Sequence, residues 1–154
     1  MAISEATGSV AALLILRVGA AVMLFYFHGL PKWAEAYAHI IHGQEWGFIS
    51  FVASLGFPFA RFFAVCAAAA ESVGALLVGA GLFTRYASGA VALTMVVAVY
   101  YHATKDMRIE LAAMYLLAAL TFVLTPPGPI SLDAVLRNRL NKMKTGSEPS
   151  RVAA

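Results

Sequence analysis

Residues 59–83 form an apolar stretch that carries a single acidic residue, Glu71, close to its middle. The stretch is 25 residues long, which is enough to cross a bilayer as a helix. A carboxylate at that depth costs about 3 kcal/mol on insertion scales unless it is paired or protonated. The chain must therefore fold so that neighbouring helices shield Glu71 and provide it with a partner.

The composition excludes an ordinary soluble domain. Of the 154 residues, 61% are hydrophobic and only 12% are charged, and the mean hydropathy is +0.78. A soluble domain of this size could not bury so much apolar surface. The net charge of +3 comes largely from a basic C-terminal segment, which suits anionic lipid headgroups. No basic patch alternates with aromatic residues, so nucleic acid is not expected as a partner, whereas the lipid bilayer is.

The apolar runs predict an all-α integral membrane four-helix bundle. Pro31 is expected to end the first helix, because proline lacks the N–H that a helix interior needs. The expected spanning helices cover about residues 10–30, 59–83, 87–102 and 109–124.

The connection between the first two spans, residues 31–58, is too polar to cross the bilayer. Trp33, Tyr37 and Ile40 recur in it at helical spacing, which predicts an amphipathic segment that lies in the membrane interface. Residues 46–55 form a second apolar part that is too short to span.

These helices predict a transmembrane domain over residues 1–136 and a basic, disordered cytoplasmic tail over residues 137–154. Four spans put both termini on one side of the membrane. The side with the termini carries six Lys and Arg residues against four on the other, which favours cytoplasmic termini in a bacterial-type plasma membrane.

Arg17 is the natural partner for Glu71 in this arrangement. It lies 13 residues before the end of the first helix, and Glu71 lies 12 residues after the start of the second. At about 1.5 Å per residue their depths agree closely, which predicts a buried ion pair between Arg17 and Glu71. Such a pair can be purely structural, or it can relay protons or anchor a ligand.

The four histidines fall on one side of the bundle in this topology. His28 ends the first helix and His102 ends the third, with Lys32 and Glu110 at the same level. We therefore expect His28, Lys32, His102 and Glu110 to form an outer polar pocket. A quinone head group is one possible occupant, because it needs only one or two hydrogen-bond partners. Interfacial histidines without any ligand are the alternative interpretation.

Other chemistry has weaker support in the sequence. His39 and His42 are spaced to face one ion, but two ligands are too few and no metal site is predicted. Cys66 is the only cysteine and is expected to pack as a small apolar residue. The patterns assign no catalytic residue.

An ordered set of short motifs covers nearly the whole chain and resembles the DoxX family of small four-helix membrane proteins. The motifs are His28-Gly29-Leu30-Pro31-Lys32, Ser54-Leu55-Gly56-Phe57-Pro58, Glu71-Ser72-Val73-Gly74, Gly79-Ala80-Gly81-Leu82-Phe83-Thr84-Arg85, Glu110 at the start of the fourth helix, and Gly128-Pro129-Ile130-Ser131-Leu132-Asp133.

The resemblance implies a plasma-membrane protein with a link to quinones, because the family takes its name from the membrane subunit of a thiosulfate:quinone oxidoreductase. It also implies partners among other membrane or redox subunits. The expected function is therefore that of a small accessory subunit of a quinone-linked redox system. A stand-alone quinone-linked oxidoreductase and a purely structural subunit of a larger complex are the alternatives.

Overall fold

The structure is a computed structural model that describes residues 2–146, with side chains described for residues 7–144. Within that range it is built from helices and contains no strand. The elements are α1 (Ala2–Leu24), η1 (Phe25–Gly29), α2 (Leu30–His42), α3 (Gly47–Ser54), α4 (Ala60–Ala69), η2 (Ala70–Gly74), α5 (Ala75–Ala80), α6 (Thr84–Lys105), α7 (Glu110–Leu124) and α8 (Leu132–Gly146), where η1 and η2 are π-helical turns.

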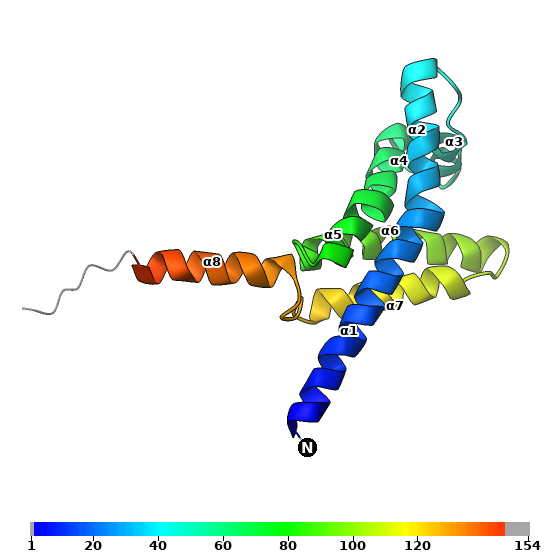
Figure 1. Cartoon of the computed structure of the whole chain (residues 1–154). Helices are drawn as coiled ribbons and strands as arrows, with labels where there is room; N and C mark the ends of the chain where they lie inside the picture. The colour runs from blue at the N-terminus through cyan, green and yellow to red at the C-terminus, as the bar shows by residue number, and fades with distance from the viewer. Residues whose placement is uncertain (1, 147–154) are drawn as a thin grey trace, which may run out of the picture.

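The first three elements form one continuous rod from α1 through η1 into α2 (Figure 1). The prediction that Pro31 ends this helix was therefore wrong. In the π turn the N–H of Leu30 donates to the carbonyl of Phe25, five residues back, rather than four. This wider turn places Pro31 in the first turn of α2, where a missing N–H and a fixed φ are tolerated.

The second span, from α4 to α5, contains the other π turn, η2, which carries Glu71. The two π turns contact each other through their backbones. A Cβ added to Gly29 of η1 would lie 2.5 Å from the carbonyl oxygen of Glu71 and 2.8 Å from Cα of Ser72. Gly29 thus permits an approach between the first two spans that no other residue would allow.

Small residues also set the remaining helix contacts. Gly74 in η2 faces Val91 of α6, and a Cβ on Gly79 in α5 would meet Cβ of Ala21 in α1 at 3.0 Å. The helices α6 and α7 pack against each other along their length, and α6 also contacts η2 and α5. Such close contact is the main source of association between helices in lipid, where the hydrophobic effect contributes little.

The chain is an all-α, multi-pass membrane protein, as the sequence predicts. Among the described residues, three helices are long and apolar enough to cross a bilayer, over Thr7–His42, Ala60–Ala80 and Thr84–Lys105. The apolar helix α7, expected at residues 109–124, is present but shorter than these three. Large apolar side chains such as Ile15, Phe62 and Val96 are exposed on the bundle, as is expected of side chains that face lipid.

The region between the first two spans contains two helices, where the sequence has an amphipathic part and a second apolar part. It consists of α2, which continues the first span, and α3, which packs on α4. A turn at Gly43, with φ of +66°, separates the two helices. Their position in the membrane interface stays a prediction.

The segment after α7 also differs from the sequence prediction. Residues 137–146, predicted to be disordered, belong to the helix α8, which projects away from the other helices (Figure 1). The sequence carries Leu132, Leu136 and Leu140 at helical spacing, a pattern that the basic composition of the segment obscures. The rest of the predicted tail, residues 147–154, lies outside the described residues.

Candidate ligand-binding cleft

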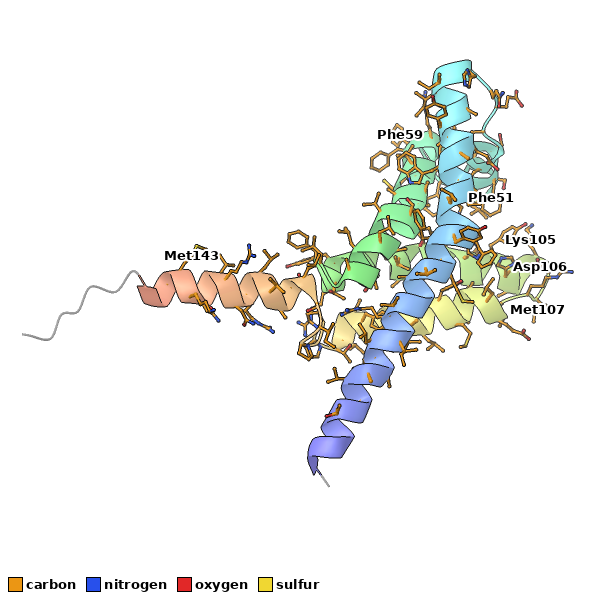
Figure 2. All side chains as sticks on the ribbon, in the orientation of Figure 1. Phe51, Phe59, Lys105, Asp106, Met107 and Met143 are labelled. Atoms are coloured by element: carbon orange, nitrogen blue, oxygen red, sulfur yellow. The ribbon has the colours of Figure 1, made fainter. Side chains whose placement is uncertain are left out.

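A cleft of about 1070 Å³ opens between the arm formed by α2, α3 and α4 and the arm formed by α6 and α7. Its walls are mostly apolar and include Phe51, which Figure 2 labels on α3, and Met107, which it labels at the turn between α6 and α7. All four residues of the predicted outer pocket line this cleft, as does Glu71: the set is His28, Lys32, His102, Glu110 and Glu71.

The most buried polar group in the cleft is an ion pair between Lys32 and Glu71. The ammonium of Lys32, in α2, donates to Oε2 of Glu71, in η2. The side chain of Glu71 is only 7% exposed and that of Lys32 is 20% exposed. The ammonium also lies 4.7 Å from the ring centre of Phe48, a cation–π contact that partly replaces its lost water.

A second polar contact holds the same two elements together. The indole N–H of Trp33 donates to the hydroxyl of Ser72, which in turn donates to the carbonyl of Ala68 at 2.5 Å. Because Ser72 is almost fully buried, these bonds satisfy groups that have no access to water. Lys32 is thereby held at a fixed position opposite Glu71.

His28 lies one helical turn before Lys32 and lines the same end of the cleft. Its ring packs edge-on against Tyr115 of α7, with ring centres 5.7 Å apart. This contact joins η1 to α7 next to the ion pair. His28, Lys32 and Glu71 therefore form a polar inner end, which we call the inner polar site.

The rim of the cleft carries a second and more exposed polar group. His102 Nδ1 lies 2.9 Å from Oδ1 of Asp106, which also accepts the backbone N–H of Arg108 at 3.1 Å. The bond from Arg108 and then the bond to His102 lower the pKa of Asp106, so the carboxylate is charged near neutral pH. Glu110 is exposed beside this turn, at the start of α7.

The predicted ion pair between Arg17 and Glu71 does not form. The guanidinium of Arg17 donates instead to the carbonyls of Pro127 and Ile130, in the latter case at 2.6 Å. The prediction assumed that the first helix ends at Pro31. Because the helix continues and η1 contacts η2, Glu71 lies level with Gly29 to Lys32. Arg17 lies level with Gly81, at the other end of the bundle.

A polar cluster that the sequence interpretation did not identify surrounds Arg17 at that end. Asp133 accepts the backbone N–H of Phe83 at 2.8 Å and that of Thr84 at 3.1 Å, and so caps α6. The Thr84 hydroxyl also donates to Asp133 at 2.9 Å. The one sign of this cluster in the sequence is Asp133, which follows the proline-rich loop. The residues that it caps lie about 50 residues earlier in the chain.

The other sites considered in the sequence have ordinary local contacts. His39 Nδ1 lies 2.7 Å from the carbonyl of Gln44, and the ring of His42 packs against that of Tyr37. Cys66 is exposed and lies on the wall of the cleft rather than within a packed core. Among the described residues, no three His, Cys, Asp or Glu side chains gather as metal ligands would.

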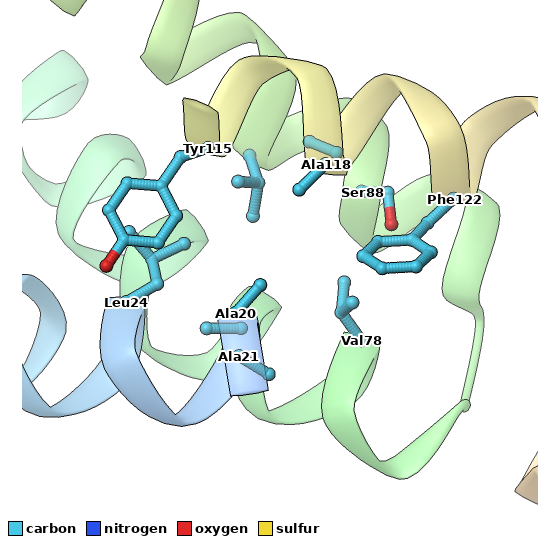
Figure 3. A pocket seen from close by; sticks show the side chains of 11 residues that line it. Ala20, Ala21, Leu24, Val78, Ser88, Tyr115, Ala118 and Phe122 are labelled. Atoms are coloured by element: carbon cyan, nitrogen blue, oxygen red, sulfur yellow. The ribbon is translucent and has the colours of Figure 1, made fainter. Parts of the chain in front are cut away.

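A smaller cavity of about 20 Å³ lies at the centre of the bundle (Figure 3). Its lining is apolar apart from Tyr115 and the buried hydroxyl of Ser88, for which the structure shows no hydrogen-bond partner. The space holds about one water molecule, and apolar side chains make up most of its lining. The large cleft is therefore the better candidate for a ligand site.

Comparison with known proteins supports the family resemblance. Neither the curated proteins nor the solved structures provide a significant match. The model of the DoxX family matches residues 12–104, which is more than half of the chain. This match spans the first three membrane helices, including both π turns and the buried Lys32–Glu71 pair. The chain therefore belongs to the DoxX family of membrane proteins.

Proposed function

We propose that this protein is a small accessory subunit of a quinone-linked redox system, and that the cleft binds the quinone. The observation that carries the proposal is the inner polar site, which lies within a largely apolar cleft of about 1070 Å³. Sites for small amphipathic ligands have this character, with apolar walls and a few placed polar groups.

The charges in the cleft favour a neutral head group. Lys32 is paired with Glu71 at the inner end, and Arg108 lies close to Glu110 in sequence at the rim. Neither end of the cleft therefore carries a large excess of positive or negative charge. A quinone fits such a site, since it is neutral and bears carbonyl oxygens that accept hydrogen bonds from His28 or Lys32. A fatty acid or an anionic phospholipid would bring a net negative charge next to the buried Glu71.

The role of an accessory subunit follows from how little redox chemistry the chain itself supplies. It has a single cysteine, so no dithiol pair can form within it. In this proposal partner subunits deliver the electrons, and the chain holds the quinone in the membrane. We further propose that it resides in a bacterial-type plasma membrane, with cytoplasmic termini and with the cleft toward the outer side.

The test is a native purification of the full chain in mild detergent, followed by mass spectrometry of the quinone and of the proteins that accompany it. We expect bound quinone and one or more redox subunits. His28→Ala should reduce the quinone retained severalfold. The control His42→Ala should leave it unchanged, because His42 is exposed and does not line the cleft. Purification without quinone, or equal retention by both variants, would contradict the proposal.

Two other functions predict different results in the same experiment. A stand-alone oxidoreductase would purify without partners and reduce quinone at a rate that falls in His28→Ala. A structural subunit would purify in a larger complex that is indifferent to that change. The projecting helix α8 favours the structural alternative, because Leu136, Leu140 and Met143 on it are exposed and available to a neighbouring protein.

A further inference from the structure

The Lys32–Glu71 pair has hydrogen-bonding capacity that the protein itself does not use. Lys32 donates to Oε2 of Glu71, and an ammonium has two further N–H donors. Among the described residues, Oε1 of Glu71 accepts no hydrogen bond, although Glu71 as a whole residue is only 5% exposed. The pair therefore presents a free donor and a free acceptor side by side at the inner end of the cleft.

We infer that the inner polar site recognises a hydroxyl group on its ligand, and therefore that the cleft binds the reduced quinol in preference to the oxidised quinone. This inference rests on the proposed function. A hydroxyl oxygen accepts from the ammonium of Lys32, and the same O–H donates to Oε1 of Glu71. One phenolic hydroxyl thus satisfies both unused groups of the pair.

A quinone carbonyl satisfies only half of this site. It accepts from Lys32, but it has no hydrogen to donate and turns its lone pairs toward Glu71. A buried acceptor that loses its water without gaining a partner weakens binding, and sites that use a ligand hydroxyl reject analogues that lack it. The expected preference for quinol over quinone is roughly tenfold in Kd.

The surroundings keep this pair in place. Trp33, next to Lys32, bonds to Ser72, next to Glu71, and Phe48 packs against the ammonium. The carboxylate cannot readily turn toward water, because η2 is packed against η1 on one side and α6 on the other. A ligand hydroxyl therefore meets a donor and an acceptor that are already positioned, and binding requires little ordering of the protein.

The experiment uses the full chain in lipid nanodiscs under anaerobic conditions, with empty nanodiscs as the blank for partition into lipid. The ligands are a decyl-substituted benzoquinone, its quinol, and the dimethyl ether of that quinol. The ether retains the ring and the tail but cannot donate a hydrogen bond. Dissociation constants come from the rise in Tm with ligand concentration. We expect the quinol to bind about tenfold more tightly than the quinone and the ether.

Variants then assign the preference to the ion pair. Glu71→Gln replaces the acceptor with an amide that can also donate, so the ratio of the quinone Kd to the quinol Kd should fall from about ten to about one. Glu35→Gln is the matched control, since Glu35 is exposed on α2 and does not line the cleft, and its ratio should equal that of the wild type.

The outcomes separate this inference from the function on which it rests. Equal binding of quinol, quinone and ether by the wild type would overturn the hydroxyl preference but leave the quinone site intact. Binding of none of them would overturn both. If Glu71→Gln does not fold, the comparison of quinol with its ether on the wild type still decides the inference.

Discussion

Lys32 and Glu71 are 39 residues apart in the chain, yet they form the buried ion pair that joins the first span to the second. Glu71 belongs to the π turn η2, Lys32 lies three residues after the π turn η1, and both residues line the cleft. Glu71, the one acidic residue of the second apolar run, is thus stabilised at the wall of the cleft rather than inside a closed core.

Removing one partner of this pair should destabilise the protein more than removing both. Lys32→Met leaves an unpaired carboxylate at a largely buried position, which costs about 3 kcal/mol. In the double variant Lys32→Met/Glu71→Met, two apolar side chains meet, and most of that loss should be recovered. Thermal unfolding of all four chains in one detergent measures the coupling. A double variant as unstable as the sum of the two single variants would show that the pair does not act as a unit.

Gly29→Ala should separate the two π turns. Its Cβ would lie 2.5 Å from a backbone oxygen of Glu71 and 2.8 Å from Cα of Ser72, and backbone atoms cannot move aside as side chains do. We expect a loss of about 2 kcal/mol or more, as for other overpacked sites. Gly19→Ala is the control, because nothing lies within 4 Å of its added Cβ. That variant should be as stable as the wild type or slightly more so. Equal Tm values for the two variants would contradict the close contact.

Asp133 should make the stability of the protein depend on pH in the acidic range. Burial alone would raise its pKa, but the hydrogen bonds from Thr84 and Phe83 outweigh that effect and hold the pKa below the ordinary 3.8. A depressed pKa means that the carboxylate stabilises the fold fully above about pH 4. That contribution is lost as the pH falls toward the folded-state value.

Unfolding of the wild type and of Asp133→Asn between pH 5 and pH 2 tests this directly. The wild type should lose more stability on acidification than the variant, which lacks the titrating group. At pH 7 the variant should already be less stable by about 1 kcal/mol, because a helix cap is weakened. Parallel curves for the two chains would exclude Asp133 as the group responsible.

Arg17→Lys should destabilise the end of the bundle opposite the cleft. The guanidinium reaches two carbonyls at once, those of Pro127 and Ile130, whereas an ammonium is a single point that reaches one. Loss of one charge-assisted bond predicts a cost of about 2 kcal/mol in the free energy of unfolding. Arg85→Lys, at an exposed position, should change stability by less than about 0.5 kcal/mol. A small effect at Arg17 would argue that its bonds to the loop are replaceable.

The long apolar runs made the membrane helices predictable. The second span was expected at residues 59–83 and is found over Ala60–Ala80, and the fourth helix was expected at 109–124 and is found over Glu110–Leu124. The length and composition of these runs decide where the membrane helices lie, so tertiary contacts change the bounds of the helices little. The residues His28, Lys32, His102 and Glu110 line one cleft, although His28 and Lys32 lie within the continuous first rod rather than at the end of a helix.

The partner of Glu71 was not predictable in the same way. Pro31 is typical of a helix end, but the helix continues through the π turn before it and carries Lys32 to the level of Glu71. A π turn depends on the tertiary contact that stabilises it, here between Gly29 and η2, and local propensity does not reveal it. If the first helix is assumed to continue past Pro31, Lys32 becomes a candidate partner for Glu71, because it lies one helical turn after His28. The cap between Asp133 and Thr84 likewise depends on a contact between distant segments.

The π turns also limit how the chain can change in length. Gly29 is held against η2, and each residue in an α-helix advances the side chains by about 100°, so losing one residue between Gly29 and Lys32 would rotate Lys32 and Trp33 by that angle away from η2. Lys32 would then leave Glu71, and Trp33 would leave Ser72. Insertions and deletions that preserve the cleft are therefore confined to the connections between helices, and the first two spans must keep a fixed count of residues.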